Sequence, residues 1–88
     1  MSRYFMQLRD GTDDLLDPEG VELEDLEAVR ERVMTAARDI LASDLRNGLL
    51  DLRYRIEAET NLGAIVYTLA FKHAFNIIPE MAEPAEFR

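Results

Sequence analysis

One long amphipathic segment, residues 25–48, constrains the fold of this chain more than any other feature. It reads DLEAVRERVMTAARDILASDLRNG. Asp25 can cap the first helical turn, and Gly48 suits the left-handed position that ends a helix. A helix over residues 26–46 would be about 31 Å long, and it needs a surface on which to bury its apolar stripe. The stripe consists of apolar residues at three- and four-residue spacing: Leu26, Val29, Val33, Ala36, Ala37, Ile40 and Leu41.

The chain before this helix has the pattern of extended structure. Residues 3–9 (RYFMQLR) alternate and are enriched in aromatic side chains, which predicts a strand. The face that carries Tyr4 is apolar throughout and is predicted to point to the core, which leaves Phe5 on the opposite face. Residues 14–17 predict a short second strand with one of its two leucines pointing inward. Residues 21–23 predict a brief extended piece that leads into the helix.

After the helix the apolar period changes from about 3.6 residues to 2. Residues 50–59 predict a half-buried strand, and residues 60–63 (TNLG) predict a hairpin loop. Residues 64–71 predict the next strand, with Val66 and Thr68 on the face away from the helix. The side chains expected to face the helix come from both strands: Leu52, Tyr54, Ile56, Ala58, Ile65, Tyr67, Leu69 and Phe71.

The last part of the chain carries weaker signals. Residues 72–78 (KHAFNII) fit either a helical turn or a continued strand, and the turn is the favoured alternative. Residues 79–88 are acidic, contain two prolines and lack periodicity, so we expect a loosely held C-terminal tail. Residues 1–78 are then expected to form a single domain.

These elements predict an α+β fold, a two-layer sandwich in β-β-α-β-β order. An antiparallel sheet of about four strands carries one long helix on one face. The other face, called the reverse face below, mixes apolar and basic side chains, and this mixture favours a two-fold homodimer interface over an ordinary solvated face. The candidate interface residues are Phe5, Arg9, Arg53, Arg55, Val66 and Thr68.

Composition limits the classes of function. The chain has 88 residues, no Cys and a formal net charge of −8. It can form no disulfide or thiolate metal site, and its charge argues against nucleic acid as a partner. The N-terminus lacks the apolar stretch of a secretory signal, and the longest mostly apolar run is about half a membrane span. We therefore expect a soluble cytoplasmic protein that has no membrane partner.

No group of residues carries recognisable catalytic chemistry. His73 is the only histidine, so the usual zinc shell is out of reach, and a general-base role would need a nucleophile and an orienting group beside it. The acidic residues between Asp10 and Glu31 do not have the spacing of a calcium loop. The four glycines are far apart and form no phosphate-binding loop. We expect no catalytic residue, no metal and no cofactor.

Several short motifs together resemble a family of small bacterial proteins of unknown function. They are Arg3-Tyr4-Phe5, Leu8-Arg9-Asp10-Gly11 and the pattern DxEGxELxDLEA of residues 17–28, followed by matches up to the strand that ends at Phe71. The resemblance implies no activity, cofactor or catalytic residue. The order of elements is also similar, more weakly, to that of antitoxins with a partial ribonuclease-H-like sheet, which is a likeness of fold alone.

Three functional hypotheses follow. The first is a non-enzymatic protein that acts through protein–protein contact, as a homodimer. The second is an antitoxin-like or adaptor protein that binds a basic protein partner through the acidic surface of residues 10–31, from Asp10 to Glu31. The third is an enzyme that uses His73 with nearby carboxylates, and it predicts a concave pocket around that residue.

Overall fold

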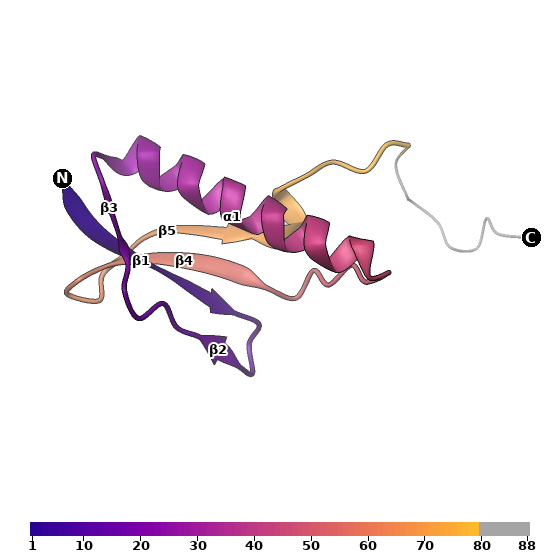
Figure 1. The fold of residues 1–88 in the computed structure, drawn as a ribbon, viewed down its shortest axis with the longest axis horizontal. Coiled ribbons are helices and arrows are strands. Elements are labelled where there is room, and N and C mark those ends of the chain that lie inside the picture. Colours follow the sequence, from indigo (N-terminus) through magenta and orange to yellow (C-terminus); the bar gives the residue numbers. More distant parts are fainter. Residues whose placement is uncertain (80–88) are drawn as a thin grey trace, which may run out of the picture.

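The computed structural model describes residues 1–79 and shows one long helix packed on one face of an antiparallel sheet (Figure 1). The predicted α+β class and two-layer arrangement are confirmed. The sheet has the order β2-β1-β4-β5, and β3 also pairs with β1. The elements are β1 (Ser2–Arg9), β2 (Asp14–Leu15), β3 (Val21–Leu23), α1 (Leu26–Arg46), β4 (Arg55–Thr60), β5 (Ile65–Ala70) and the short 3-10 helix η1 (Phe71–His73).

Helix α1 has the predicted bounds and the predicted cap. The Asp25 carboxylate accepts a hydrogen bond from the Ala28 N–H at 2.9 Å, which satisfies a backbone donor of the first turn. Gly48 follows the helix with φ of +80°. The stripe is buried from Val29 to Leu41, at Val29, Val33, Ala37 and Leu41, whereas Leu26 at its start is exposed.

The core lies between this stripe and the inward face of the sheet. The aromatic rings of Tyr54 and Phe71 lie 5.8 Å apart between their centroids, at the end of the sheet where η1 begins. Phe71 is fully buried, so the segment that follows β5 closes the core at that end. The buried apolar residues outside the helix are Tyr4, Ile56, Ala58, Leu69, Phe71 and Ala74.

The strand predicted over residues 50–59 is shorter, because β4 begins only at Arg55. The Asp51 carboxylate accepts hydrogen bonds from both the backbone N–H and the guanidinium of Arg53. Such a local bond offers the backbone an alternative to strand pairing. Residues 49–54 therefore run as an irregular segment, and Leu52 is exposed rather than buried.

Because of a β-bulge in β5, two residues do not lie on the faces predicted for them. Ala58 pairs with Tyr67, but the next residue of β4, Glu59, pairs with Ile65, so Val66 is an extra residue in the ladder. Because a bulge shifts the alternation of side chains, Val66 packs against the core and not on the reverse face as predicted. Ile65 lies across from Glu59 and is 53% exposed, although it was expected to face the helix.

The remaining predictions fall on the two ends of the chain. Leu15 pairs with Leu8, so it lies on the helix side of the sheet as predicted, and it lines a depression together with Ala36 and Ile40 of α1. Leu15 and Leu16 are nevertheless 68% and 58% exposed, because β2 is the outermost strand of the sheet. The turn alternative for residues 72–78 is confirmed by η1 and the irregular chain after it. The predicted tail lies outside the described residues, apart from Pro79.

Candidate interaction surfaces

The six predicted interface residues do not all lie on the reverse face. Phe5, Arg9, Arg55 and Thr68 lie there, on three neighbouring strands. Arg53 lies off the sheet, in the irregular segment before β4, where it is paired with Asp51. Val66 packs on the core side because of the bulge. The prediction that Arg53 and Val66 lie on this face is therefore wrong.

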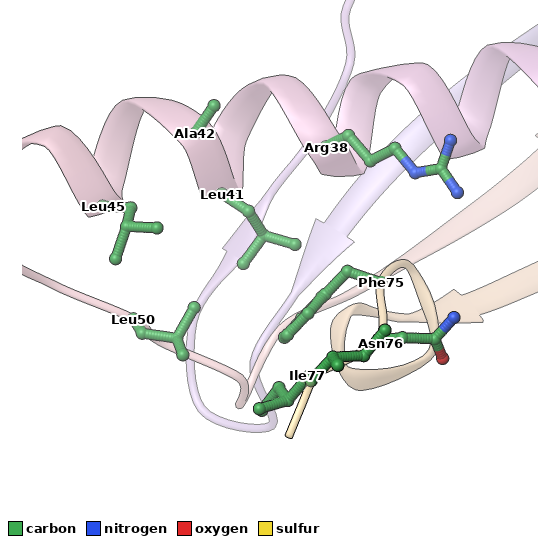
Figure 2. A pocket seen from close by; sticks show the side chains of 9 residues that line it. Arg38, Leu41, Ala42, Leu45, Leu50, Phe75, Asn76 and Ile77 are labelled. Atoms are coloured by element: carbon green, nitrogen blue, oxygen red, sulfur yellow. The ribbon is translucent and has the colours of Figure 1, made fainter. Parts of the chain in front are cut away.

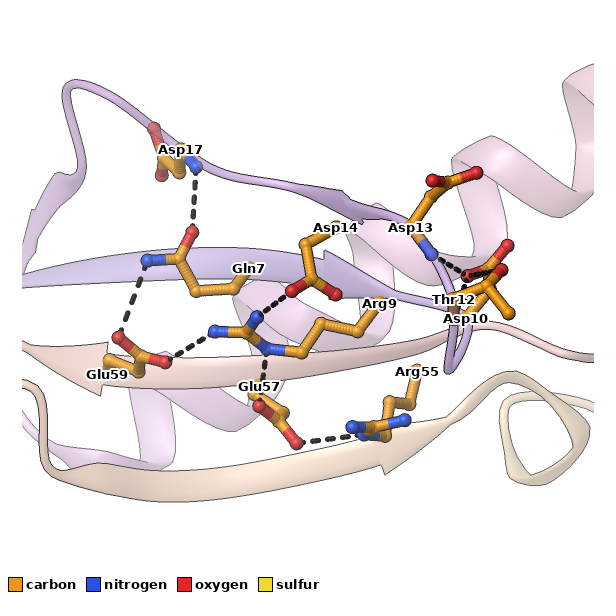
Figure 3. Close-up of polar contacts among 10 residues, drawn as sticks. All are labelled: Gln7, Arg9, Asp10, Thr12, Asp13, Asp14, Asp17, Arg55, Glu57 and Glu59. Carbon is orange, nitrogen blue, oxygen red and sulfur yellow. Dashed lines mark hydrogen bonds and ion pairs between the residues drawn. The ribbon is translucent and has the colours of Figure 1, made fainter.

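The middle of the reverse face is a connected set of hydrogen bonds and ion pairs, which we call the reverse-face network (Figure 3). Arg9 lies at its centre, since its guanidinium bonds Glu57 at 2.7 Å and Glu59 at 3.0 Å, both on β4. It also reaches Asp14 on β2 at 2.6 Å. The side chains of Arg9, Glu57 and Glu59 are only 21%, 13% and 16% exposed. Because these charges are partly shielded from water, each carboxylate depends on its arginine partner.

The network extends at both ends. Arg55 donates to Glu57 at 2.8 Å, so this carboxylate is shared between two guanidinium groups. The hydrogen bond from Arg55 lowers the pKa of Glu57 most; desolvation opposes the change and the bond from Arg9 adds to it. At the other end, buried Gln7 donates to Glu59 and accepts from the backbone N–H of Asp17. The basic residues of the predicted interface thus have intramolecular partners.

Asp17 holds the turn of residues 17–20 onto the edge of β1. Its Oδ2 accepts from the Met6 N–H at 3.2 Å, and its Oδ1 accepts from the Gly20 N–H at 3.0 Å. Desolvation raises the pKa of Asp17, but the accepted hydrogen bonds outweigh it and the net change is downward. The turn also brings Gly20 against the ring of Phe5, since a Cβ on Gly20 would lie 2.8 Å from Phe5 Cε2. Phe5 is therefore partly covered by its own chain.

The acidic stretch of residues 10–31 divides into two groups. Five of its carboxylates accept hydrogen bonds inside the domain, at turns, in ion pairs or at the helix cap: Asp10, Asp14, Asp17, Glu22 and Asp25. The other five side chains are exposed: Asp13, Glu19, Glu24, Glu27 and Glu31. About half of the acidic surface thus has a structural use.

An apolar groove lies where the C-terminal half of α1 meets the chain after η1, and we call it the end groove (Figure 2). Its volume is about 530 Å³. In Figure 2 the side chains of Leu41 and Leu45 from α1 lie across from Phe75 and Ile77, with Leu50 at one end. Four of its lining residues are exposed aliphatic side chains: Leu45, Leu50, Ile77 and Ile78.

Sequence reasoning missed the end groove. One wall comes from residues 75–78, which carry no clear periodicity, and Leu50 falls within the predicted strand of residues 50–59. The available signal was composition: Leu45, Leu49 and Leu50 extend the apolar run past the end of the helix stripe. A run that continues past the helix predicts either a deeper core or an exposed patch, and the structure has the patch.

His73 is exposed at the end of η1, and it lines neither the end groove nor the smaller depression between β2 and α1. Within residues 1–79, no cluster of three or more His, Cys, Asp or Glu side chains could hold a metal ion. Over the same residues, no helix combines the length and apolar character needed to cross a membrane. The pocket that the third hypothesis requires around His73 is thus not formed by either of these two depressions.

Comparison with known proteins supplies the family. A family model described as "Domain of unknown function (DUF6894)" matches residues 3–72. This range contains α1, β4, β5 and nearly all of β1, and it ends before the wall of the end groove that Phe75 and Ile77 form. No curated protein and no solved structure matches the chain significantly. The chain therefore belongs to the DUF6894 family, a domain family of unknown function.

Proposed function

We propose that this protein is a non-enzymatic module that acts through protein–protein contact and assembles as a homodimer. The observation that carries the proposal is the number of large aliphatic side chains left at the surface. Among residues 1–79, twelve large apolar side chains are exposed, against ten residues in the buried core. Contiguous apolar patches on a small soluble domain are typical of contact surfaces.

The size of the domain supports self-association. A chain of 88 residues buries a modest fraction of its surface, so a second copy that covers apolar side chains adds substantially to stability. Two-fold dimers are the commonest assembly among soluble homo-oligomers. Within the described residues, the end groove and the outer edge of β5 are the two surfaces that such contact can use.

The reverse face supports this proposal less than its sequence suggested. The cores of protein interfaces are depleted of charged residues, whereas the centre of this face consists of Arg9, Glu57 and Glu59. Since these groups already pair with one another, the network suits the rim of an interface or a solvated surface. Thr68 is exposed at the margin of this face, on β5, and it remains a contact residue in our proposal.

The second candidate function is an antitoxin-like or adaptor protein that binds a basic protein. The exposed carboxylates of Glu24, Glu27 and Glu31 favour it, because Glu27 and Glu31 lie on the first turns of α1 and Glu24 lies just before the Asp25 cap. Complementary charge gives such a surface specificity and fast association. Affinity capture from its source cells tests it: the triple variant Glu24→Gln, Glu27→Gln and Glu31→Gln should lose a basic partner that the native chain retains at low salt. Capture of nothing but the protein itself would contradict this function.

Sedimentation equilibrium of the full chain tests the homodimer. The proposal predicts a mass twice the monomer value of 10.1 kDa at micromolar concentration, falling toward the monomer on dilution. A mass that stays at 10.1 kDa up to the highest soluble concentration would rule the homodimer out.

A further inference from the structure

The two edges of the sheet differ in how they are covered. On the outer side of β1, β3 pairs with residues 2–4 and β2 pairs with Leu8 and Arg9. Between them the Asp17 carboxylate accepts the hydrogen bond of the Met6 N–H. That edge is therefore occupied along its length, and it ends in strands of two and three residues, which are too short to recruit another chain efficiently.

Within residues 1–79, no strand pairs with the opposite edge. Strand β5 is last in the order of the sheet, on the side away from β2 (Figure 1). The Phe71 N–H bonds the Tyr54 carbonyl at 3.0 Å, and this bond fixes which residues point toward β4. Because antiparallel ladders alternate, Leu69 and Tyr67 also bond toward β4. The backbone N–H and C=O groups of Thr68 and Ala70 then point away from the sheet.

Strand β5 also lacks most of the features that usually protect an edge. Its sequence, IVYTLA, contains no charged residue and no proline. A bulge interrupts its first half at Val66, but the half that contains Thr68 and Ala70 is regular. Exposed apolar edges of this kind pair readily with another strand.

We infer that β5 pairs with β5 of a second copy, antiparallel about a two-fold axis, so that the two sheets become one. This inference rests on the homodimer of the proposed function and specifies its interface. A two-fold axis at Leu69 brings the outward groups of Thr68 opposite those of Ala70 in the second copy, and the outward groups of Ala70 opposite those of Thr68. The identical strands carry no charge, so this pairing opposes no like charges along its length.

The neighbouring side chains are compatible with this arrangement. Thr68 is exposed on the reverse face, across the ladder from Glu57, and its side chain lies diagonally across the axis from Thr68 of the second copy. On the helix face, the ring of Tyr67 lies under the guanidinium of Arg30, 5.8 Å from its centroid. The pairing uses no residue that lines the end groove.

Opposite charges introduced at Thr68 in separate variants test the inference, with sedimentation equilibrium as the measurement. Thr68→Lys and Thr68→Glu each place like charges near the two-fold axis, and each should weaken dimerisation about tenfold or more. An equimolar mixture of the two variants should restore the dimer. Leu62→Lys serves as the control, because Leu62 is 90% exposed at the tip of the β4–β5 loop, outside the pairing strand, and it should dimerise like the native chain. Circular dichroism on each variant verifies that the monomer remains folded.

Two further variants separate the possible failures. Thr68→Pro removes an N–H that the domain itself does not use for pairing with β4, and it should abolish the dimer while the thermal unfolding transition persists. Leu45→Glu places a charge in the end groove and should leave the dimer intact. A native chain that is monomeric would overturn the proposed homodimer itself. A native dimer that resists all three Thr68 substitutions but dissociates with Leu45→Glu would overturn only the edge pairing.

Discussion

The Asp17 carboxylate replaces a strand carbonyl opposite the Met6 amide, with Oδ2 at 3.2 Å from the Met6 nitrogen. This contact fills the gap between β2 and β3, and the same carboxylate closes its own turn through the Gly20 N–H. One side chain thus completes the outer edge of β1, which explains why the DPEG motif of residues 17–20 is needed at this place in the chain.

Replacing this carboxylate should destabilise the domain. Asp17→Ala leaves the N–H groups of Met6 and Gly20 without their acceptor, and we expect a loss of about 1–3 kcal/mol in the free energy of unfolding. Urea denaturation measures the loss, and faster hydrogen exchange at the Met6 amide should accompany it. Asp13→Ala is the control, since Asp13 is exposed in the preceding loop and should change stability little. Equal effects of the two substitutions would refute the role of Asp17.

Gly20 should tolerate no side chain. Its φ of +73° is strained for other residues, and an added Cβ would lie 2.8 Å from both the Tyr4 carbonyl oxygen and the Phe5 ring. Gly20→Ala should therefore cost about 2–4 kcal/mol. Gly63→Ala isolates the backbone strain, because Gly63 has φ of +85° and open space where its Cβ would lie, and it should cost about 1 kcal/mol. Thermal unfolding of both variants compares them directly, and similar losses would contradict the close contact with Phe5.

We expect Arg9 to stabilise the reverse-face network and, through it, the folded domain. In Arg9→Ala, Glu57 loses one arginine partner and Glu59 loses its ion pair. Both carboxylates are poorly exposed, so water does not fully replace the lost partner. Arg3→Ala is the matched control, since the pair of Arg3 with Glu22 lies at the surface with about half of each side chain exposed. We expect the loss of stability to be roughly two- to threefold larger for Arg9→Ala. Equal chemical denaturation midpoints would show that the network adds nothing beyond a surface pair.

Asp51 should make stability depend on pH in acid. The hydrogen bonds and charge of Arg53 lower the pKa of Asp51 from 3.8 to about 2. Because the folded state has the lower pKa, this contribution is complete above about pH 5 and is lost as the pH falls through about 4 to 2. Asp51→Asn should therefore be less stable than the native chain at pH 7, and the difference should shrink toward pH 2. Urea midpoints measured across this range check it, and Arg53→Gln should reduce the pH dependence in the same way. A constant difference between native chain and Asp51→Asn would contradict the assignment.

The parts of the fold that could be predicted are those whose sequence signals lie close together in the chain. The bounds of α1 were predictable because Asp25, the stripe and Gly48 are contiguous signals whose geometry the helix itself fixes. The start of β4 could not be predicted, because the alternation of residues 50–54 continues up to the strand. The backbone is diverted there by a hydrogen bond that the Asp51 carboxylate accepts from the Arg53 N–H. The bulge at Val66 also leaves no mark in the sequence, since it depends on how β5 registers against β4.

For the candidate surfaces as well, local patterns could be predicted from the sequence, and contacts between distant segments could not. Sequence reasoning placed Phe5, Arg9 and Arg55 on the reverse face correctly, because alternation along a strand settles which face a residue takes. It could not show that Arg9 finds its partners on the same face, since Glu57 and Glu59 come from a different strand. The end groove needs the packing of residues 75–78 against α1, and no pattern within that segment predicts such a contact.

The central claim of this account is that the open edge of β5 joins two copies of the chain, and residue-resolved amide hydrogen exchange tests it most directly. At a concentration where the protein is dimeric, the Thr68 and Ala70 amides should be as protected as that of Leu69, and on dilution to monomer their protection alone should be lost. If the Thr68 and Ala70 amides exchange rapidly in a sample whose mass is that of a dimer, the edge is not the interface and the account is wrong.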